Sequence, residues 1–148
     1  MKKLMFMAAV AALSATSCKK EKSDFTPTVP LSTKNVTFSV HQARDYSGEQ
    51  YNGVNASLKL SVFTTKISNG ETRVLWDSIV PYQSLRNFPR LQNPGVITRR
   101  FTGIDDSKVS LAASYSITFK DALGNINQVA RNEFAGNGNS TLTIPVKL

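Results

Sequence analysis

From Asn35 onward the sequence alternates between apolar and polar residues with a period of two. In the segment Lys108–Lys120 every second residue is apolar or aromatic: Val109, Leu111, Ala113, Tyr115, Ile117 and Phe119. Successive side chains of a β-strand point to opposite faces, so this pattern predicts a strand with one buried face. Leu142–Leu148 repeats the pattern, and no window of twelve residues carries a helical stripe. We therefore predict an all-β domain.

Two tight turns are indicated by adjacent asparagine and glycine. Asn69-Gly70 lies between the predicted strands Ala56–Ile67 and Thr72–Val80, and Gly124-Asn125 follows the strand that ends at Lys120. Both residue types tolerate the positive φ that short hairpin loops require. Two antiparallel hairpins are therefore expected.

Further strands bring the expected total to about seven between Asn35 and Leu148. These are Val36–Val40, Val96–Phe101 and Ile126–Phe134. This count and length resemble the antiparallel β-sandwich of immunoglobulin and fibronectin type III domains, in architecture only, because a Cys-Trp-Cys framework is lacking. A small barrel is the alternative. Pro145 cannot donate a ladder hydrogen bond, which predicts a sheet edge or a bulge in the last strand.

The chain begins with the three parts of a secretory signal. Lys2 and Lys3 precede ten uncharged apolar residues, Leu4–Leu13, and small polar residues follow as far as Ser17. Ten helical residues span about 15 Å, half of a hydrocarbon core of about 30 Å, so a permanent membrane span is not expected. The pattern predicts export.

The chain's one cysteine lies where this signal ends. The run Ser17-Cys18-Lys19-Lys20-Glu21 resembles lipoproteins of the Bacteroidota, whose signal is cut before a cysteine that becomes the lipid-carrying first residue. The resemblance covers residues 1–24. It implies a signal peptide at 1–17 and attachment of fatty acyl chains, palmitate among them, to Cys18. An ordinary secreted protein cut near Ala15 is the alternative.

The same resemblance implies a destination. Lysine rather than aspartate after the cysteine implies transport to the outer membrane, with the periplasmic or the surface face left open. Residues 18–34 are polar, contain Pro27 and Pro30, and show no periodicity, so we expect a flexible tether. The predicted folded domain then occupies residues 35–148.

The orientation of the domain follows from strand parity. When successive strands reverse direction, connections alternate between two ends, so the first, third and fifth lie away from the anchor. These are Arg44–Asn55, Pro81–Gly95 and Asp121–Asn125. The first two are long and rich in residue types common on recognition surfaces. As possible contacts to a protein or glycan we predict Arg44, Tyr46, Tyr51, Tyr82, Arg86 and Phe88. The alternative is that the aromatic side chains fold inward and cap the core.

Catalytic and metal-binding motifs are missing from the sequence. There is no G-x-S-x-G, H-E-x-x-H or P-loop pattern. The one histidine, His41, has no partner at motif spacing and is expected to be solvated or locally hydrogen-bonded. Asp105-Asp106-Ser107 is expected to cap a turn rather than bind calcium. We therefore expect a binding module with no catalytic residue, cofactor or metal. A small envelope hydrolase and a structural accessory subunit of an outer-membrane complex are the alternatives.

The remaining predictions concern charge and modification. The chain has 18 Lys and Arg against 10 Asp and Glu, but no basic stripe with interleaved aromatics, so no nucleic acid partner is expected. Trp76 is predicted to lie in the core. Asp77-Ser78-Ile79 resembles a short O-glycosylation motif of exported Bacteroidota proteins, which makes Ser78 a possible modification site.

Overall fold

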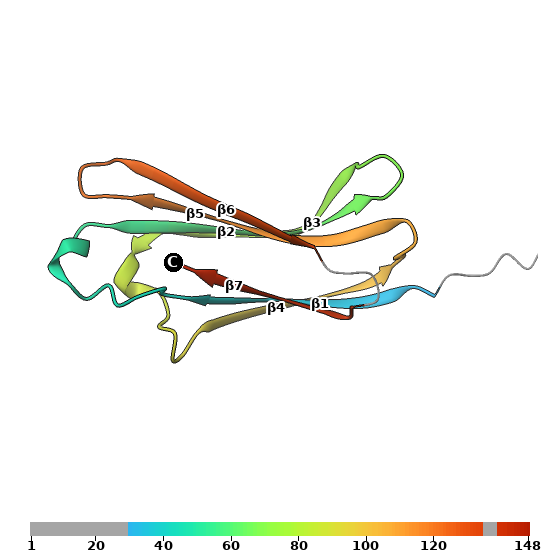
Figure 1. The fold of residues 1–148 in the computed structure, drawn as a ribbon, viewed down its shortest axis with the longest axis horizontal. Coiled ribbons are helices and arrows are strands. Elements are labelled where there is room, and N and C mark those ends of the chain that lie inside the picture. The colour runs from blue at the N-terminus through green and yellow to red at the C-terminus, as the bar shows by residue number, and fades with distance from the viewer. Residues whose placement is uncertain (1–29, 135–138) are drawn as a thin grey trace, which may run out of the picture.

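The computed structural model describes residues 30–134 and 139–148, in which seven strands form two sheets packed face to face (Figure 1). This confirms the predicted all-β sandwich. The strands are β1 (Ser32–His41), β2 (Asn55–Lys66), β3 (Thr72–Ser84), β4 (Gly95–Ile104), β5 (Val109–Lys120), β6 (Ile126–Phe134) and β7 (Thr141–Lys147). Two short 3-10 helices are η1 (Glu49–Tyr51) and η2 (Leu85–Asn87).

Several predictions fall outside the described residues. These are the signal peptide at 1–17, Cys18 and the tether as far as residue 29. No helix in the part of the chain that the structure describes is long and apolar enough to cross a membrane.

The strand order is β4-β1-β7 in one sheet and β3-β2-β5-β6 in the other. Every pairing is antiparallel except that of β1 with β7, which is parallel. In immunoglobulin domains the first and second strands share a sheet, whereas here they lie in different sheets. The likeness to immunoglobulin domains therefore holds for the two-layer architecture alone. β7 is an edge strand, as Pro145 predicts.

The core lies between the two inner faces. The largest fully buried side chains come from β1, β2, β5 and β7: Val36, Phe38, Leu58, Leu60, Val62, Leu111, Ile117, Ile144 and Val146. Each contributes about 1.5–3 kcal/mol when it leaves water, before the cost of ordering the chain. The apolar residues that recur at every second position in the sequence thus supply most of the side chains of this core.

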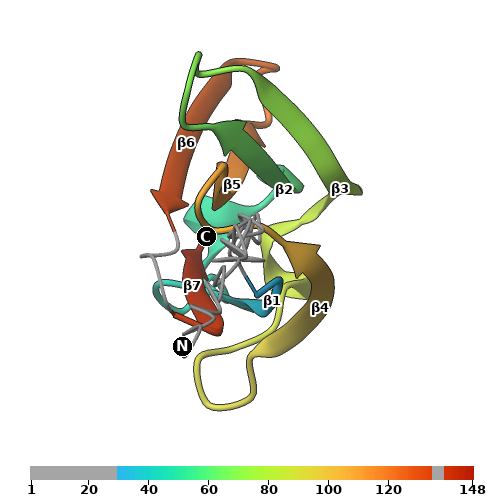
Figure 2. The same cartoon turned by 90° about the vertical axis from the view of Figure 1, so that its right-hand side faces the viewer.

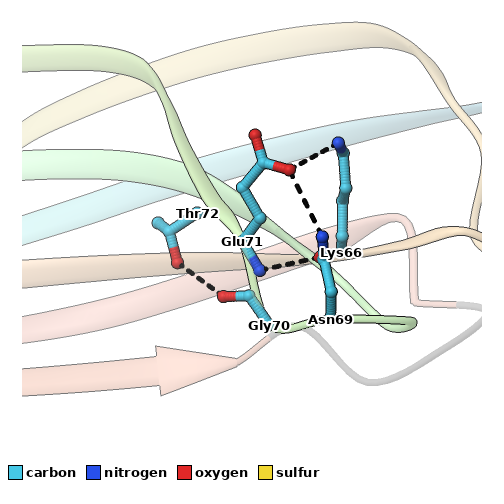
Figure 3. Close-up of polar contacts among 5 residues, drawn as sticks. All are labelled: Lys66, Asn69, Gly70, Glu71 and Thr72. Carbon is cyan, nitrogen blue, oxygen red and sulfur yellow. Dashed lines mark hydrogen bonds and ion pairs between the residues drawn. The ribbon is translucent and has the colours of Figure 1, made fainter.

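Both predicted hairpins form, and the loop between β2 and β3 shows how side chains fix the turn (Figure 3). Gly70 has a φ of 72°, which few other residues adopt at low cost. The Glu71 amide donates to Asn69 Oδ1 at 3.0 Å, while Lys66 Nζ donates to Glu71 Oε2 at 2.6 Å. The bond from Lys66 is the largest cause of the lowered pKa of Glu71, and Asn69 adds to it.

Trp76 closes one side of the sandwich. Figure 2 shows β3 and β4, the edge strands of the two sheets, on the same side of the molecule. The Trp76 ring lies 6.0 Å from that of Phe38, and the guanidinium of Arg99 in β4 lies 4.9 Å from the Trp76 ring centroid. Trp76 is half-buried and packs against the core cluster, so it shields the core edge while Arg99 covers its outer face.

Lys34 was predicted to belong to the flexible tether, but it lies in the first strand of the domain. β1 begins at Ser32, so the last three residues assigned to the tether belong to a strand. Lys34 precedes Val36 by two residues and shares its inner face, where it is 3% exposed. Its Nζ lies 2.8 Å from Asp106 Oδ2. A buried ammonium requires such a partner, and the turn after β4 supplies it.

Candidate functional site

Three connections, 42–54, 85–94 and 121–125, lie together at the end of the sandwich opposite the start of β1 (Figure 1). The strand pairings agree with the prediction that successive connections alternate between the two ends of the domain. We call this the distal end. β3 continues to Ser84, four residues past its predicted limit, so Tyr82 lies in a strand rather than in a loop.

Two of the six predicted contact residues cap the core. Tyr46 and Phe88 are 7% and 4% exposed and belong to the core cluster. The Tyr46 hydroxyl donates to the Leu148 main-chain oxygen at 2.6 Å, and burial raises the pKa of this phenol. The Tyr51 ring packs edge-on against the Tyr46 ring, with 4.9 Å between the ring centroids. The capping alternative therefore describes the packing of Tyr46 and Phe88.

Gln42 joins the end of β1 to the loop after β3. Its side chain is buried, and Nε2 donates to the main-chain oxygens of Leu85 at 3.0 Å and Phe88 at 2.7 Å. The main-chain N–H of Gln42 donates to the main-chain oxygen of Pro89 at 2.8 Å. The sequence gives no sign of this role, because a glutamine after a strand is usually exposed.

Arg86 joins the same two loops from the opposite direction. Its Nε donates to the Tyr46 oxygen at 3.0 Å, and Nη2 donates to the oxygens of Ser47 and Gly48 at 2.8 and 3.0 Å. These bonds satisfy carbonyl groups of an irregular segment. Arg86 is therefore a structural link between loops 42–54 and 85–94.

A polar hollow of about 240 Å³ opens beside these links. It is lined by Gln42, Ala43, Arg44, Asp45, Arg90, Leu91 and Gln92. An adjoining hollow of about 90 Å³ shares Gln42, Asp45 and Arg90 and adds Tyr46, Ser47 and Arg86. We call the two together the distal hollow. Of the predicted residues, the exposed Arg44 and Arg86 line it, and the buried Tyr46 borders its smaller part.

Asp45 is held in place within the distal hollow. The amide and the hydroxyl of Ser47 both donate to its carboxylate at 2.9 Å. These two bonds are the main cause of its lowered pKa, and the charges of Arg90 and Arg86 act in the same direction. The hollow therefore contains a fixed, ionised carboxylate among guanidinium groups.

Tyr82 lies elsewhere at the distal end. It is 49% exposed and lines a broader hollow of about 560 Å³ with Gly53, Asn55, Lys120, Asp121 and Ala122. The six predicted residues thus divide among four environments, namely the core cap, the links between loops, the distal hollow and the broader hollow beside Tyr82. Arg90, Asp45, Gln42 and Gln92 complete the distal hollow but were not among the predicted contacts.

The other sites suggested by the sequence fall away from the distal hollow. Ser78 is half-buried in β3 opposite Leu60, on the inner face of the sheet, and its glycosylation stays a prediction. Asp105 caps its turn as expected, because its carboxylate accepts from the Ser107 amide at 3.1 Å. Within residues 30–134 and 139–148, no three His, Cys, Asp or Glu side chains could hold a metal ion.

The expectation for His41 is wrong. The side chain is 7% exposed rather than solvated, and its Nδ1 has no hydrogen-bond partner among the described residues. The strand β7 pairs with β1 as far as Lys147, opposite His41, and Leu148 donates to the His41 oxygen at 3.0 Å. The sequence does not reveal that a second strand lies beside this residue.

Comparison with known proteins identifies no relative. The chain matches no family model, no curated protein and no solved structure. The function must therefore be inferred from the geometry of the distal end and from the sequence pattern at the start of the chain.

Proposed function

We propose that this protein is a lipid-anchored lipoprotein of the outer membrane that catalyses no reaction and binds a glycan or protein with its distal end. One observation carries the binding part. The longest connections gather at the end opposite the start of β1, and they enclose the distal hollow. With an anchor at Cys18, that end points away from the membrane.

The loops are fixed before any partner arrives. Gln42 and Arg86 hold 42–54 and 85–94 together through bonds to main-chain oxygens. A surface ordered in advance loses less conformational entropy on binding. This supports a recognition role for the loops rather than a role as loose connections.

The accessory-subunit alternative lacks the support it needs. An exposed apolar edge at Leu142–Leu148 would favour such a role, but Ile144, Val146 and Leu148 are buried in the core. The proposal therefore stays with the distal end as the binding surface.

The anchor is tested by Cys18→Ala in the full chain, produced in a bacterium that exports lipoproteins. We expect the parent chain to incorporate an alkyne analogue of palmitate and to stay with the membrane after an alkaline wash. Cys18→Ala loses the label and moves to the soluble fraction, because acyl chains provide the membrane affinity. Ser23→Ala is the matched control and keeps both properties. Unchanged labelling of Cys18→Ala would contradict lipidation.

The binding face is tested by a photo-crosslinking amino acid at Asn93, which is exposed beside the distal hollow, or at Asn69, in the hairpin at the opposite end. Irradiation of intact cells is expected to give a discrete adduct from position 93 and none from position 69. Adducts from position 69 alone, or from both positions equally, would show that the distal end is not the binding face.

A further inference from the structure

We infer that the distal hollow binds a sugar that carries a carboxylate, such as a uronic acid residue of an acidic glycan. This inference rests on the proposed function and names the ligand class of the same surface. It follows from the charge, the hydrogen-bonding groups and the size of the hollow.

Two guanidinium groups are available to an anion. Arg44 and Arg90 line the larger part of the hollow, and neither forms an ion pair with any described carboxylate. Arg86 differs, because its donors are used by main-chain oxygens. A guanidinium fits a carboxylate through two parallel hydrogen bonds. Arg44 and Arg90 therefore border the same hollow, where either guanidinium can offer this pairing to a carboxylate.

The other lining groups suit hydroxyls. Asp45 is fixed by Ser47 as an ionised acceptor. Gln42 is buried, and its Oε1 accepts no hydrogen bond from any residue that the structure describes, while its Nε2 is occupied. The Gln92 amide adds a donor and an acceptor. A ligand with one anionic group and several hydroxyls matches this set.

The same features disfavour other anions. Three arginines and one aspartate leave the lining with a net positive charge that attracts any anion, but the side chains of an acidic peptide offer no hydroxyl groups to Asp45, Gln42 and Gln92. Inorganic phosphate offers no hydroxyl-bearing ring for the amide groups. The larger part of the hollow, about 240 Å³, lies below the roughly 300 Å³ at which drug-sized sites begin, which fits one ring. Leu91, 63% exposed at the rim, provides an apolar surface for the ring face.

The test is calorimetric titration of the full chain, purified in detergent, with trigalacturonate and with the neutral galactose trimer. The two probes differ in that only trigalacturonate carries carboxylates. We expect the acidic trimer to bind at least about tenfold more tightly, since a hydrogen bond to a charged group is worth about that factor or more. Arg44→Gln and Arg90→Gln are each expected to weaken it about ten- to a hundredfold.

Two further variants keep the result interpretable. Arg73→Gln changes an exposed arginine of β3 outside the hollow and is expected to leave the affinity unchanged. Arg44→Lys keeps the charge but loses the bidentate geometry, so an intermediate affinity is expected. Thermal unfolding of each variant confirms that it is folded.

Several outcomes would overturn the inference. These are equal affinity for both trimers, no binding of either, an unchanged affinity in both Arg→Gln variants, or tighter binding of an oligoglutamate peptide or of inorganic phosphate. The proposed function fails differently, through the absence of a crosslink from position 93. A distal adduct together with no uronate binding would reject the acidic sugar alone.

Discussion

Replacing Asp106 with alanine is expected to lower the free energy of unfolding by about 3 kcal/mol. The change leaves the Lys34 ammonium, whose side chain is 4% exposed, without the carboxylate that lies 2.8 Å away. Removal of one partner of a buried pair costs more than the pair itself contributes, because the remaining charge is desolvated without compensation. Urea denaturation of the full chain measures the loss.

The matched control for this pair removes both charges. Lys34→Met combined with Asp106→Leu is expected to restore most of the lost stability, since apolar residues of similar volume often replace a buried ion pair at little cost. A cost below about 1 kcal/mol for Asp106→Ala alone, the range of an exposed salt bridge, would mean that Lys34 reaches water in solution.

Phe38→Ala is expected to have an effect of similar or larger size, a loss of about 4 kcal/mol. Phe38 is fully buried in β1 and packs against Trp76, with 6.0 Å between ring centroids. Its truncation removes apolar burial and leaves a cavity between the sheets. Trp76, the one tryptophan of the chain, reports both unfolding and the local change through its fluorescence.

Val74→Ala serves as the control for Phe38→Ala. Val74 also lies in a strand but is 59% exposed, so its truncation is expected to change the free energy of unfolding by less than about 0.5 kcal/mol. Similar losses in the two variants would contradict the assignment of Phe38 to the core.

The strand positions were predictable because each depends on a short stretch of sequence. The alternation in Val109–Lys120 and the glycines of the two hairpins act locally, and the ends at which the loops lie follow from the number of strands alone. The parallel pairing of β1 with β7 was not predictable. It joins the two ends of the domain, and no local pattern specifies which strands become neighbours.

The burial and direction of charged and loop side chains also could not be predicted from the sequence. Lys34 looks like part of a polar tether until Asp106, distant in sequence, is placed beside it. In the candidate site, Arg86 and Arg90 belong to the same segment, yet one links two loops and the other lines a hollow. Loop sequences have no period, so side-chain direction there depends on partners from other segments.

The position of β1 also determines how the domain would carry a mechanical load. β1 is the central strand of its sheet, follows the tether directly, and pairs with β7 in register from Asn35 to His41. β7 in turn ends at the distal end, beside the loops of the candidate site. A pull between the proposed anchor and a ligand held distally would act along these strands. Because residues 42–45 of the distal hollow directly follow β1, much of this load would pass through the covalent backbone of β1, and the hydrogen bonds of β1 to β4 and β7 would carry little of it.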